Sequence, residues 1–388
     1  MRFADVIGQD EAKMRLILAA HAGRISHAQL FFGPEGSGAL SLALAYAQFL
    51  NCQHPVRSLV QGVDIPTDAC GQCPSCVKYA KLAHPDLHFI FPVAATKDVP
   101  KDPVSKRFYD KWRPWVIRTN GYGNLNDWYA EIGIEKKQGL INSEDCSEIL
   151  RVLSYKSYEG GYKVMMIWMV EKLFHAAAPK ILKVLEEPPE QTLFLLITED
   201  PTQLINTIRS RTQLIKMNSI ADQDMLQALK RVNNDPAVKW GEVIRMAQGN
   251  YREALRLLQE KDPDSGMFEQ FKQWMRYCFQ RNVQGIQELG QEFAGLGREE
   301  QKQLLFYALN IVRESMLLGI RGEALSRLTE AELEFAVKFG PFVAPPRGMF
   351  VVSELEKALG HVERNANASI LFTGLSLGIS RILKQPVA

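Results

Sequence analysis

A glycine-rich loop between an apolar run and a helix-like segment is the first group of residues that could do chemistry. Residues 33–40 read Gly-Pro-Glu-Gly-Ser-Gly-Ala-Leu; they follow the apolar run 28–32 and precede the helical pattern of 40–50. This order is typical of a P-loop, in which backbone N–H groups of the loop cradle phosphates. Three glycines would form that cradle: Gly33, Gly36 and Gly38.

The two side chains that bind phosphate and metal in a P-loop are absent from this loop. A working loop carries Lys after its last glycine and then Ser or Thr, whose hydroxyl holds Mg²⁺. Ala39 and Leu40 occupy these places. Hydrogen bonds to charged groups contribute roughly 1.5–3 kcal/mol each, so their loss should weaken nucleotide binding by roughly a hundredfold to ten-thousandfold. We therefore expect no ATP in this site.

The second half of a magnesium site is missing as well. The apolar run 162–168 reads as a buried parallel strand. An ATPase of this kind ends that strand with acidic residues, which hold Mg²⁺ and activate water. Trp168 and Met169 occupy those places, and the nearest acid, Glu171, lies past the strand end. These residues indicate a nucleotide-binding architecture without hydrolytic activity.

Four of the six cysteines have the spacing of a metal site: Cys52, Cys70, Cys73 and Cys76. Two C-x2-C steps let a tight turn aim several sulfurs at one ion, and a fourth thiol completes the closed tetrahedral shell of structural zinc. An iron–sulfur cluster and free thiols are the alternatives, and His54 or His84 could replace a sulfur ligand. A closed shell leaves no open position, so Zn²⁺ would stabilise the fold and take no part in a reaction.

The composition is that of an ordinary globular protein. The chain has 388 residues, enough for two or three domains. Its 46 basic and 44 acidic residues nearly cancel, so no overall charge attracts nucleic acid. Residues 1–9 lack the apolar core of a signal peptide, and the longest apolar run, 164–170, is too short to span a bilayer. We expect a cytoplasmic protein without membrane contact.

Strand-like apolar runs alternate with helix-like segments in the first part of the chain. The runs are 28–32, 162–168, 192–198 and 212–217. The alternation predicts an α/β domain at 1–218, with a parallel sheet that helices cover on both faces. After it every pattern is helical, which predicts a small helical domain at 219–262 and an all-α domain at 267–388. The residues at 262–266 are typical of a linker.

Residues 94–139 form an insert that interrupts the alternation. They carry tryptophans, tyrosines and prolines among many charges. The stretch 107–115 mixes bases with aromatic rings, and such rings could stack on single-stranded nucleic acid. The alternative is a surface excursion that the packing of its own rings holds in place.

Several short motifs together resemble bacterial DNA polymerase III clamp-loader subunits of the AAA+ class. Besides the loop and the cysteines, the matching segments are 3–9, 26–33, 84–86, 185–189, 208–211 and 363–368. The resemblance implies an AAA+ P-loop domain, a helical lid domain and a helical collar for oligomerisation. Within the family, the hydrolysing gamma/tau subunits carry the Lys and the Ser or Thr that this loop lacks. The chain is therefore more similar to delta prime, which lacks a working P-loop. We also expect no tau-like extension after the third domain.

The resemblance assigns roles to four further residues: Ser210, Arg211, Thr198 and Arg252. In ring-shaped ATPases of this class, the Ser-Arg step at 210–211 reaches ATP held by the neighbouring subunit. An arginine supplied in trans is worth roughly 10³–10⁵ in rate. Thr198 matches a phosphate-sensing position, and Arg252 matches a lid arginine that contacts the subunit's own nucleotide. The alternative for Arg211 is an ordinary surface arginine before a strand.

The resemblance implies a non-hydrolysing structural subunit of the clamp loader, within a DNA-directed DNA polymerase holoenzyme. It would act with gamma/tau and delta subunits to load the sliding clamp onto primer-template DNA, and would supply Arg211 to an adjacent ATPase. Two alternatives stay open: a nucleotide-binding gamma/tau-like ATPase with a non-standard P-loop, and a zinc-dependent nucleic-acid-binding module. The near-neutral charge of the chain argues against the second.

Overall fold

The chain folds into two compact units. The computed structural model describes residues 1–60, 62–135, 137–174, 178–236, 238–259, 265–321, 328–364 and 366–384. The first unit comprises Met1–Pro236 and Ala247–Leu255, and the second comprises Ala237–Met246 and Arg256–Ala388. The predicted linker at 262–266 lies partly outside the described residues. The division of the helical half into a lid and a collar stays a prediction.

A five-stranded parallel sheet forms the centre of the first unit. Its strands lie in the order β4-β5-β6-β1-β7, and all neighbouring pairs are parallel. The strands are β1 (Ala28–Phe32), β4 (Leu87–Ile90), β5 (Lys163–Trp168), β6 (Thr192–Thr198) and β7 (Gln213–Lys216). The predicted α/β fold class with a parallel sheet is confirmed. The edge strand β4 was missed.

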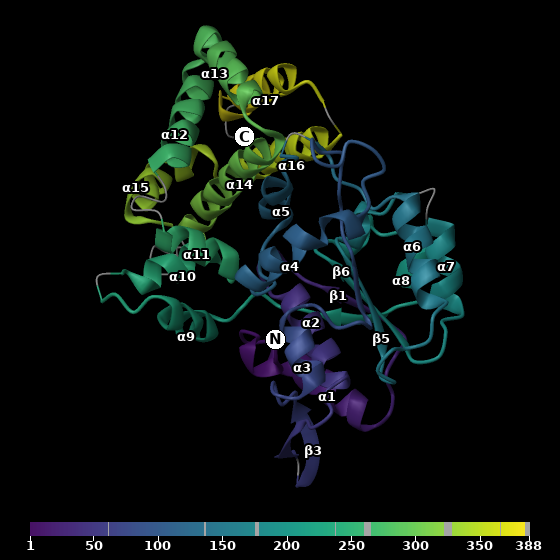
Figure 1. The fold of residues 1–388 in the computed structure, drawn as a ribbon. Helices are drawn as coiled ribbons and strands as arrows, with labels where there is room; N and C mark the ends of the chain where they lie inside the picture. The colour runs from purple at the N-terminus through teal and green to yellow at the C-terminus, as the bar shows by residue number, and fades with distance from the viewer. Residues whose placement is uncertain are drawn as a thin grey trace. The chain divides into compact units, whose positions relative to one another are not determined.

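Both faces of the central strands β5, β6 and β1 are buried, which explains why these strands are nearly continuous apolar runs. Successive residues of a strand point to opposite faces, so on β6 Leu195 enters one core and Leu196 enters the other. The first core contains α2 (Ala39–Leu50). The second contains α6 (Ser143–Leu153), α7 (Ala178–Glu186) and α8 (Asn206–Arg209). Figure 1 shows α2 on one side of the strands and this second group on the other.

A β-hairpin and several short helices surround this sheet. The hairpin pairs β2 (Val56–Val60) with β3 (Val63–Asp68) antiparallel, and it projects from the rest of the first unit in Figure 1. The other helices of the first unit are η1 (Phe3–Asp5), α1 (Asp10–His21), α3 (Pro74–Ala80), η2 (Ser105–Phe108), α4 (Tyr109–Arg118), α5 (Leu125–Ile132), η3 (Val170–Lys172), η5 (Pro201–Gln203), α9 (Asp222–Val232) and the start of α11 (Tyr251–Gln259). α10 (Trp240–Ala247) belongs almost wholly to the second unit.

The insert packs its aromatic rings into the first core. Trp112, Trp115 and Trp128 are at most 1% exposed. The ring of Trp112 stacks on Phe91 at 4.0 Å between centroids, and Trp128 Nε1 donates a hydrogen bond of 2.9 Å to the carbonyl oxygen of Pro92. These rings present no face to solvent, so they cannot stack on nucleic acid bases. Of the two alternatives for the insert, packing by its own rings is the one observed.

The second unit is helical wherever it is described. Its main helices are α12 (Ser265–Gln280), α13 (Val283–Gly295), α14 (Arg298–Arg321), α15 (Glu330–Phe339), η7 (Gly340–Phe342), α16 (Arg347–Glu363) and α17 (Ala368–Lys384). They enclose one core of aromatic and aliphatic side chains. Within it Trp274 Nε1 donates a hydrogen bond of 2.8 Å to Ser376 Oγ, which satisfies the one polar atom of that buried ring. The predicted helical character is confirmed.

Candidate functional site

The glycine loop joins β1 to α2, as the sequence predicts. Gly38 precedes the helix with a φ of 90°, a conformation that residues with a Cβ rarely adopt. A Cβ at Gly38 would also lie 2.7 Å from the ring of Tyr122. Both the backbone conformation and the nearby ring therefore require glycine at this position. α2 is apolar on every side and almost wholly buried. Its first N–H groups, the phosphate ligands of a working P-loop, are therefore held in place.

Apolar and acidic groups surround the loop. Leu40 is 2% exposed and belongs to the first core. The carboxylate of Glu35 accepts hydrogen bonds of 3.1 Å from Asn124 Nδ2 and Asn250 Nδ2, and a negative charge here repels phosphate. Among the described residues that line the cavity at the loop, none is Lys or Arg.

The cavity itself is small. Its volume is about 30 Å³, which suffices for a water molecule or two. Small-molecule sites in proteins typically measure roughly 300–1,000 Å³. The glycines Gly33, Gly36 and Gly38 all line it, so the predicted cradle residues do come together. In this conformation they have no room for a nucleotide.

The end of β5 lacks acidic side chains at the places where a magnesium site would need them. Trp168 and Met169 are each 2% exposed, and the ring of Trp168 lies 5.2 Å from that of Trp112 of the insert. Glu171 lies in η3, where its carboxylate accepts the N–H of Glu199 at 3.4 Å. Burial raises the pKa of the Glu171 carboxyl, which disfavours the ionised form that a hard cation requires.

Thr198 and Arg252 both lie beside the loop. Thr198 ends β6, is fully buried and lines the cavity. Arg252, in the first turn of α11, makes a two-pronged ion pair with Asp127 of the insert, with distances of 2.9 and 2.6 Å. These hydrogen bonds raise the pKa of Arg252 above its usual value. The guanidinium is thus already neutralised by the chain's own carboxylate, and contact with a nucleotide stays a prediction.

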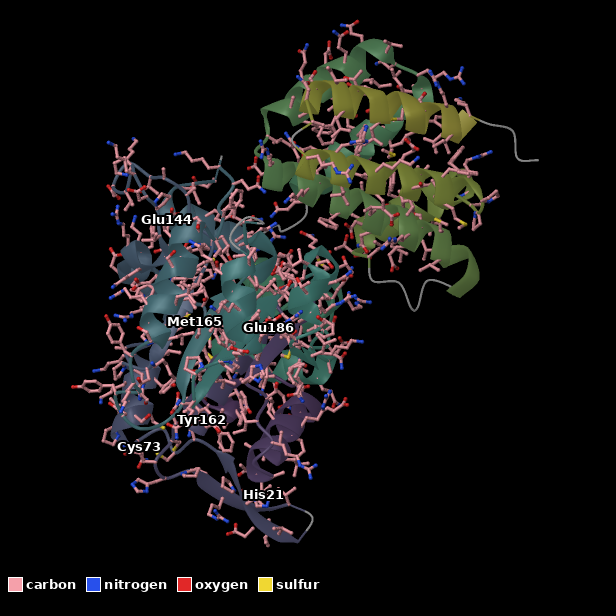
Figure 2. The ribbon with its side chains drawn as sticks, turned by 90° about the vertical axis from the view of Figure 1, so that its right-hand side faces the viewer. His21, Cys73, Glu144, Tyr162, Met165 and Glu186 are labelled. Carbon is pink, nitrogen blue, oxygen red and sulfur yellow. The ribbon has the colours of Figure 1, made fainter. Side chains whose placement is uncertain are left out.

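Arg211 lies at the surface, where α8 turns into β7. Its Nη1 donates a hydrogen bond of 3.0 Å to the carbonyl oxygen of Thr207, and its Nη2 pairs with the carboxylate of Glu186 at the end of α7. The Arg211 side chain is 35% exposed and that of Glu186 is 48% exposed. Ser210 is also exposed, and its hydroxyl donates to the Thr207 carbonyl at 3.2 Å. Glu186 is labelled in Figure 2.

The structure gathers the four predicted cysteines into one group. The sulfurs of Cys52, Cys70, Cys73 and Cys76 all lie within 4.8 Å of one another, and those of Cys70 and Cys76 are 3.9 Å apart. Zn–S bonds of about 2.3 Å in a tetrahedron require sulfurs about 3.8 Å apart. The donor set and the spacing therefore fit a closed tetrahedral metal shell. Cys73, labelled in Figure 2, lies near the base of the projecting hairpin.

Local backbone geometry aims these sulfurs inward. Cys52 directly follows the end of α2, and Cys73 caps the N-terminus of α3 with its sulfur, where Pro74 begins the helix. The N–H groups of Gln72 and Cys73 donate to the sulfur of Cys70. They lower the pKa of the Cys70 thiol to about 6. Burial has the opposite effect on Cys52 and Cys76 and raises the pKa of both thiols.

Neither histidine takes the place of a sulfur. Among the described residues, the group within 4.8 Å consists of the four cysteines and contains no histidine. His84 Nε2 lies 3.0 Å from the Glu159 carboxylate instead, and its ring lies against Tyr79 at 4.6 Å. The four cysteines named from the sequence spacing are the ones that lie together; their role as metal ligands stays a prediction.

None of the helices within the described ranges combines the length and the apolar character needed to cross a bilayer.

The sequence of the first unit matches a known protein family. The family described as "DNA polymerase III, delta subunit" matches residues 8–221, more than half of the chain. The chain belongs to this family. The resemblance to bacterial clamp-loader subunits of the AAA+ class is thereby confirmed.

Curated relatives carry names from the same assembly. The chain is 28% identical over 264 residues to DNA polymerase III subunit gamma/tau of Mycobacterium tuberculosis H37Rv, which covers 66% of this chain and 36% of the relative. It is 27% identical over 260 residues to subunit tau of Escherichia coli K12, which covers 66% of this chain and 32% of the relative. The chain thus spans about a third of the length of these relatives.

Two solved structures from Thermotoga maritima align over most of the chain. A DNA polymerase III gamma subunit-related protein covers 96% of this chain and 100% of its own, at 14% identity and a TM-score of 0.37. The RuvB Holliday junction branch migration motor covers 95% and 86%, at 13% identity and a TM-score of 0.39.

Proposed function

We propose that this chain is a non-hydrolysing, delta prime-type subunit of the DNA polymerase III clamp loader. It acts with gamma/tau and delta subunits in the ATP-driven loading of the sliding clamp onto primer-template DNA. One contrast supports this role above all: the chain's own loop has neither cation nor Mg²⁺ ligand, whereas the guanidinium of Arg211 reaches the surface. The chain supplies Arg211 in trans to a neighbouring subunit and binds no nucleotide in its own site.

Arg211 acts in trans on ATP held by an adjacent ATPase subunit. Its planar, permanently charged guanidinium stabilises the charge that spreads over a transferring phosphoryl group. The pair with Glu186 does not prevent this, because both side chains are more than a third exposed and exposed ion pairs contribute only about 0–1 kcal/mol. A triphosphate carries more charge than one carboxylate and can replace Glu186 as the partner of Arg211.

The four-cysteine group holds a structural Zn²⁺. The sulfurs fit a closed tetrahedral shell, so the ion ties the end of α2 to α3 and leaves no position for substrate. Cys52, Cys70, Cys73 and Cys76 are the ligands, and no reaction step involves the metal.

The alternative is a gamma/tau-like ATPase with a non-standard P-loop, which the names of the curated relatives favour. It requires ATP with Mg²⁺ to bind in the chain's own cleft. The acidic Glu35, the apolar Ala39 and the small cavity all count against such binding.

Substitution of Arg211 in the assembled clamp loader tests the proposed role. For Arg211→Ala we expect single-turnover hydrolysis at the site that receives the arginine to fall by about 10³–10⁵. Assembly should be unchanged, as judged by co-migration of the subunits. Arg211→Lys should restore little, because an ammonium lacks the planar fork.

Arg209→Ala is the matched control, since Arg209 is an exposed arginine only two residues away, at the end of α8. It should leave hydrolysis unchanged. Equal rates for the Arg211→Ala and unmodified assemblies would remove the arginine finger from the proposal.

A further inference from the structure

We propose that residues 119–127 of the insert are a built-in occupant of the nucleotide cleft. This plug segment closes the cleft and fastens the start of α11 to the glycine loop. Nucleotide is therefore excluded by the chain's own backbone and side chains as well as by the missing lysine. The inference goes beyond the role proposed for Arg211 and does not depend on it.

Tyr122 is the centre of the plug segment. Its hydroxyl accepts a hydrogen bond of 2.9 Å from the backbone N–H of Ile7, and its ring lies where a Cβ of Gly38 would otherwise stand. The ring also meets Tyr251 edge-on, at 4.9 Å between centroids. One side chain, only 4% exposed, thus connects the N-terminal segment, the loop and α11.

The backbone of the plug segment approaches the first turn of α2. Gly121 has a φ of +70°, and a Cβ on it would lie 3.0 Å from the Ser41 nitrogen and 3.1 Å from the Ser41 Cα. In a working P-loop, the N–H groups of the loop and of this first turn point at phosphate. Here main-chain atoms of the insert cover that surface.

Two polar residues at the start of α5 fasten the loop and α11 together. Asn124 caps α5 and also donates from Nδ2 to Glu35, which accepts from Asn250 as well. Asp127 accepts the N–H of Asn124 at 3.3 Å and forms the ion pair with Arg252. Glu35, Asn250, Asp127 and Arg252 thus pair with residues of this chain beside the loop.

The backbone of α11 completes the enclosure. The N–H of Tyr251 donates to the carbonyl oxygen of Gly36 at 3.3 Å. A nucleotide that entered the cleft would have to displace Tyr122 and separate Arg252 from Asp127. When a closed state is favoured by about a hundred to one, the apparent affinity of a ligand for the open state falls about a hundredfold.

Restoring the lysine with and without the plug separates the two causes of exclusion. The full chain would carry Ala39→Lys with Leu40→Thr, then the same pair with Tyr122→Ala, and binding of a fluorescent ATP analogue with Mg²⁺ would be titrated. We expect binding to the triple variant to be at least about a hundredfold tighter than to the double variant. Equal affinities for the two variants would overturn the proposal. Thermal unfolding confirms that each variant is folded.

If neither variant binds the ATP analogue, hydrogen exchange tests whether the plug segment closes the cleft. The Ile7 amide should exchange slowly in the unmodified chain, because Tyr122 accepts its hydrogen. Tyr122→Phe keeps the ring and removes the acceptor, so exchange at Ile7 should become at least about tenfold faster, whereas a strand amide such as that of Ile167 should not change. Fast exchange at Ile7 in the unmodified chain would show an open cleft and refute the plug.

Discussion

The two ends of α2 carry two sites that differ in how much of their ligand set remains. The N-terminal end has the loop glycines but Ala39 and Leu40 in place of the charged and hydroxyl ligands. The C-terminal end leads into Cys52, which joins three other cysteines in a complete four-sulfur group. One buried helix positions both, so the scaffold does not cause the difference.

The difference lies in what satisfies the polar groups at each end. A closed metal shell needs every one of its ligands. The loop's backbone can be covered by another part of the chain, and the insert does so through Tyr122 and Gly121. On the proposal of structural zinc, one end depends on an external ion, whereas the other is covered by an intramolecular partner.

Substitution of one cysteine of the four-sulfur group should have the largest effect on stability. It tests whether the C-terminal end of α2 leads into a metal site. Cys76 and Cys146 are both fully buried, which makes Cys76→Ala and Cys146→Ala matched variants. Cys76→Ala should remove zinc and cost several kcal/mol, because structural zinc contributes about 10–16 kcal/mol of binding free energy in small domains. Cys146→Ala should keep one zinc per chain and cost about 1 kcal/mol.

Emission spectrometry for zinc and denaturant unfolding, followed by the fluorescence of the insert's tryptophans, would measure both variants. Equal zinc contents in the two variants would show that the four-cysteine group holds no metal.

Sequence reasoning succeeded where the signal is local. The loop glycines follow an apolar strand and the cysteines recur at fixed spacing, so both could be recognised within a few residues. β4 (Leu87–Ile90) was missed, although β7 at the opposite edge has the same four-residue length and was predicted. The hairpin between Cys52 and Cys70 was missed because its strands are largely exposed and carry no apolar run.

The plug segment could not be predicted because its contacts join distant parts of the chain. Gly121-Tyr122-Gly123 is visible in the sequence as a turn, but nothing local shows that it docks on Gly38. Likewise Arg252 could be assigned to a nucleotide, whereas its observed partner is Asp127. Glu35 accepts hydrogen bonds from Asn124 and Asn250, and an acidic residue inside the loop is the signal that could have been used.

The pH dependence of metal binding sharpens the comparison at the metal end. Burial raises the pKa of Cys52 and Cys76 above that of an ordinary thiol, so both are protonated at neutral pH and metal binding must release at least two protons. Affinity for Zn²⁺ should therefore fall by at least about a hundredfold for each unit that the pH drops. The pKa of Cys70 is about 6, so this thiol adds a further proton only below that pH.

Competition with a chromophoric chelator would measure the Zn²⁺ affinity between pH 5.5 and 8, a range that includes the Cys70 pKa of about 6. The affinity should change more steeply with pH at the acid end of this range. An affinity that did not change with pH would mean that the cysteines are thiolates before the metal arrives. That result would contradict the effect assigned to burial.

The smallest expected effect is on stability, and it tests whether the insert packs against the first turn of α2. Gly121 and Gly133 both belong to the insert and have φ of +70° and +73°, but no atom lies within 4 Å of a Cβ built on Gly133. Each Gly→Ala change should cost about 1 kcal/mol for the left-handed backbone. Gly121→Ala should cost a further 1–3 kcal/mol or so, because the added methyl meets the backbone of Ser41, which cannot move without shifting α2. Denaturant unfolding of the first unit measures both, and equal costs would mean that the insert does not touch the helix and that the cleft is open.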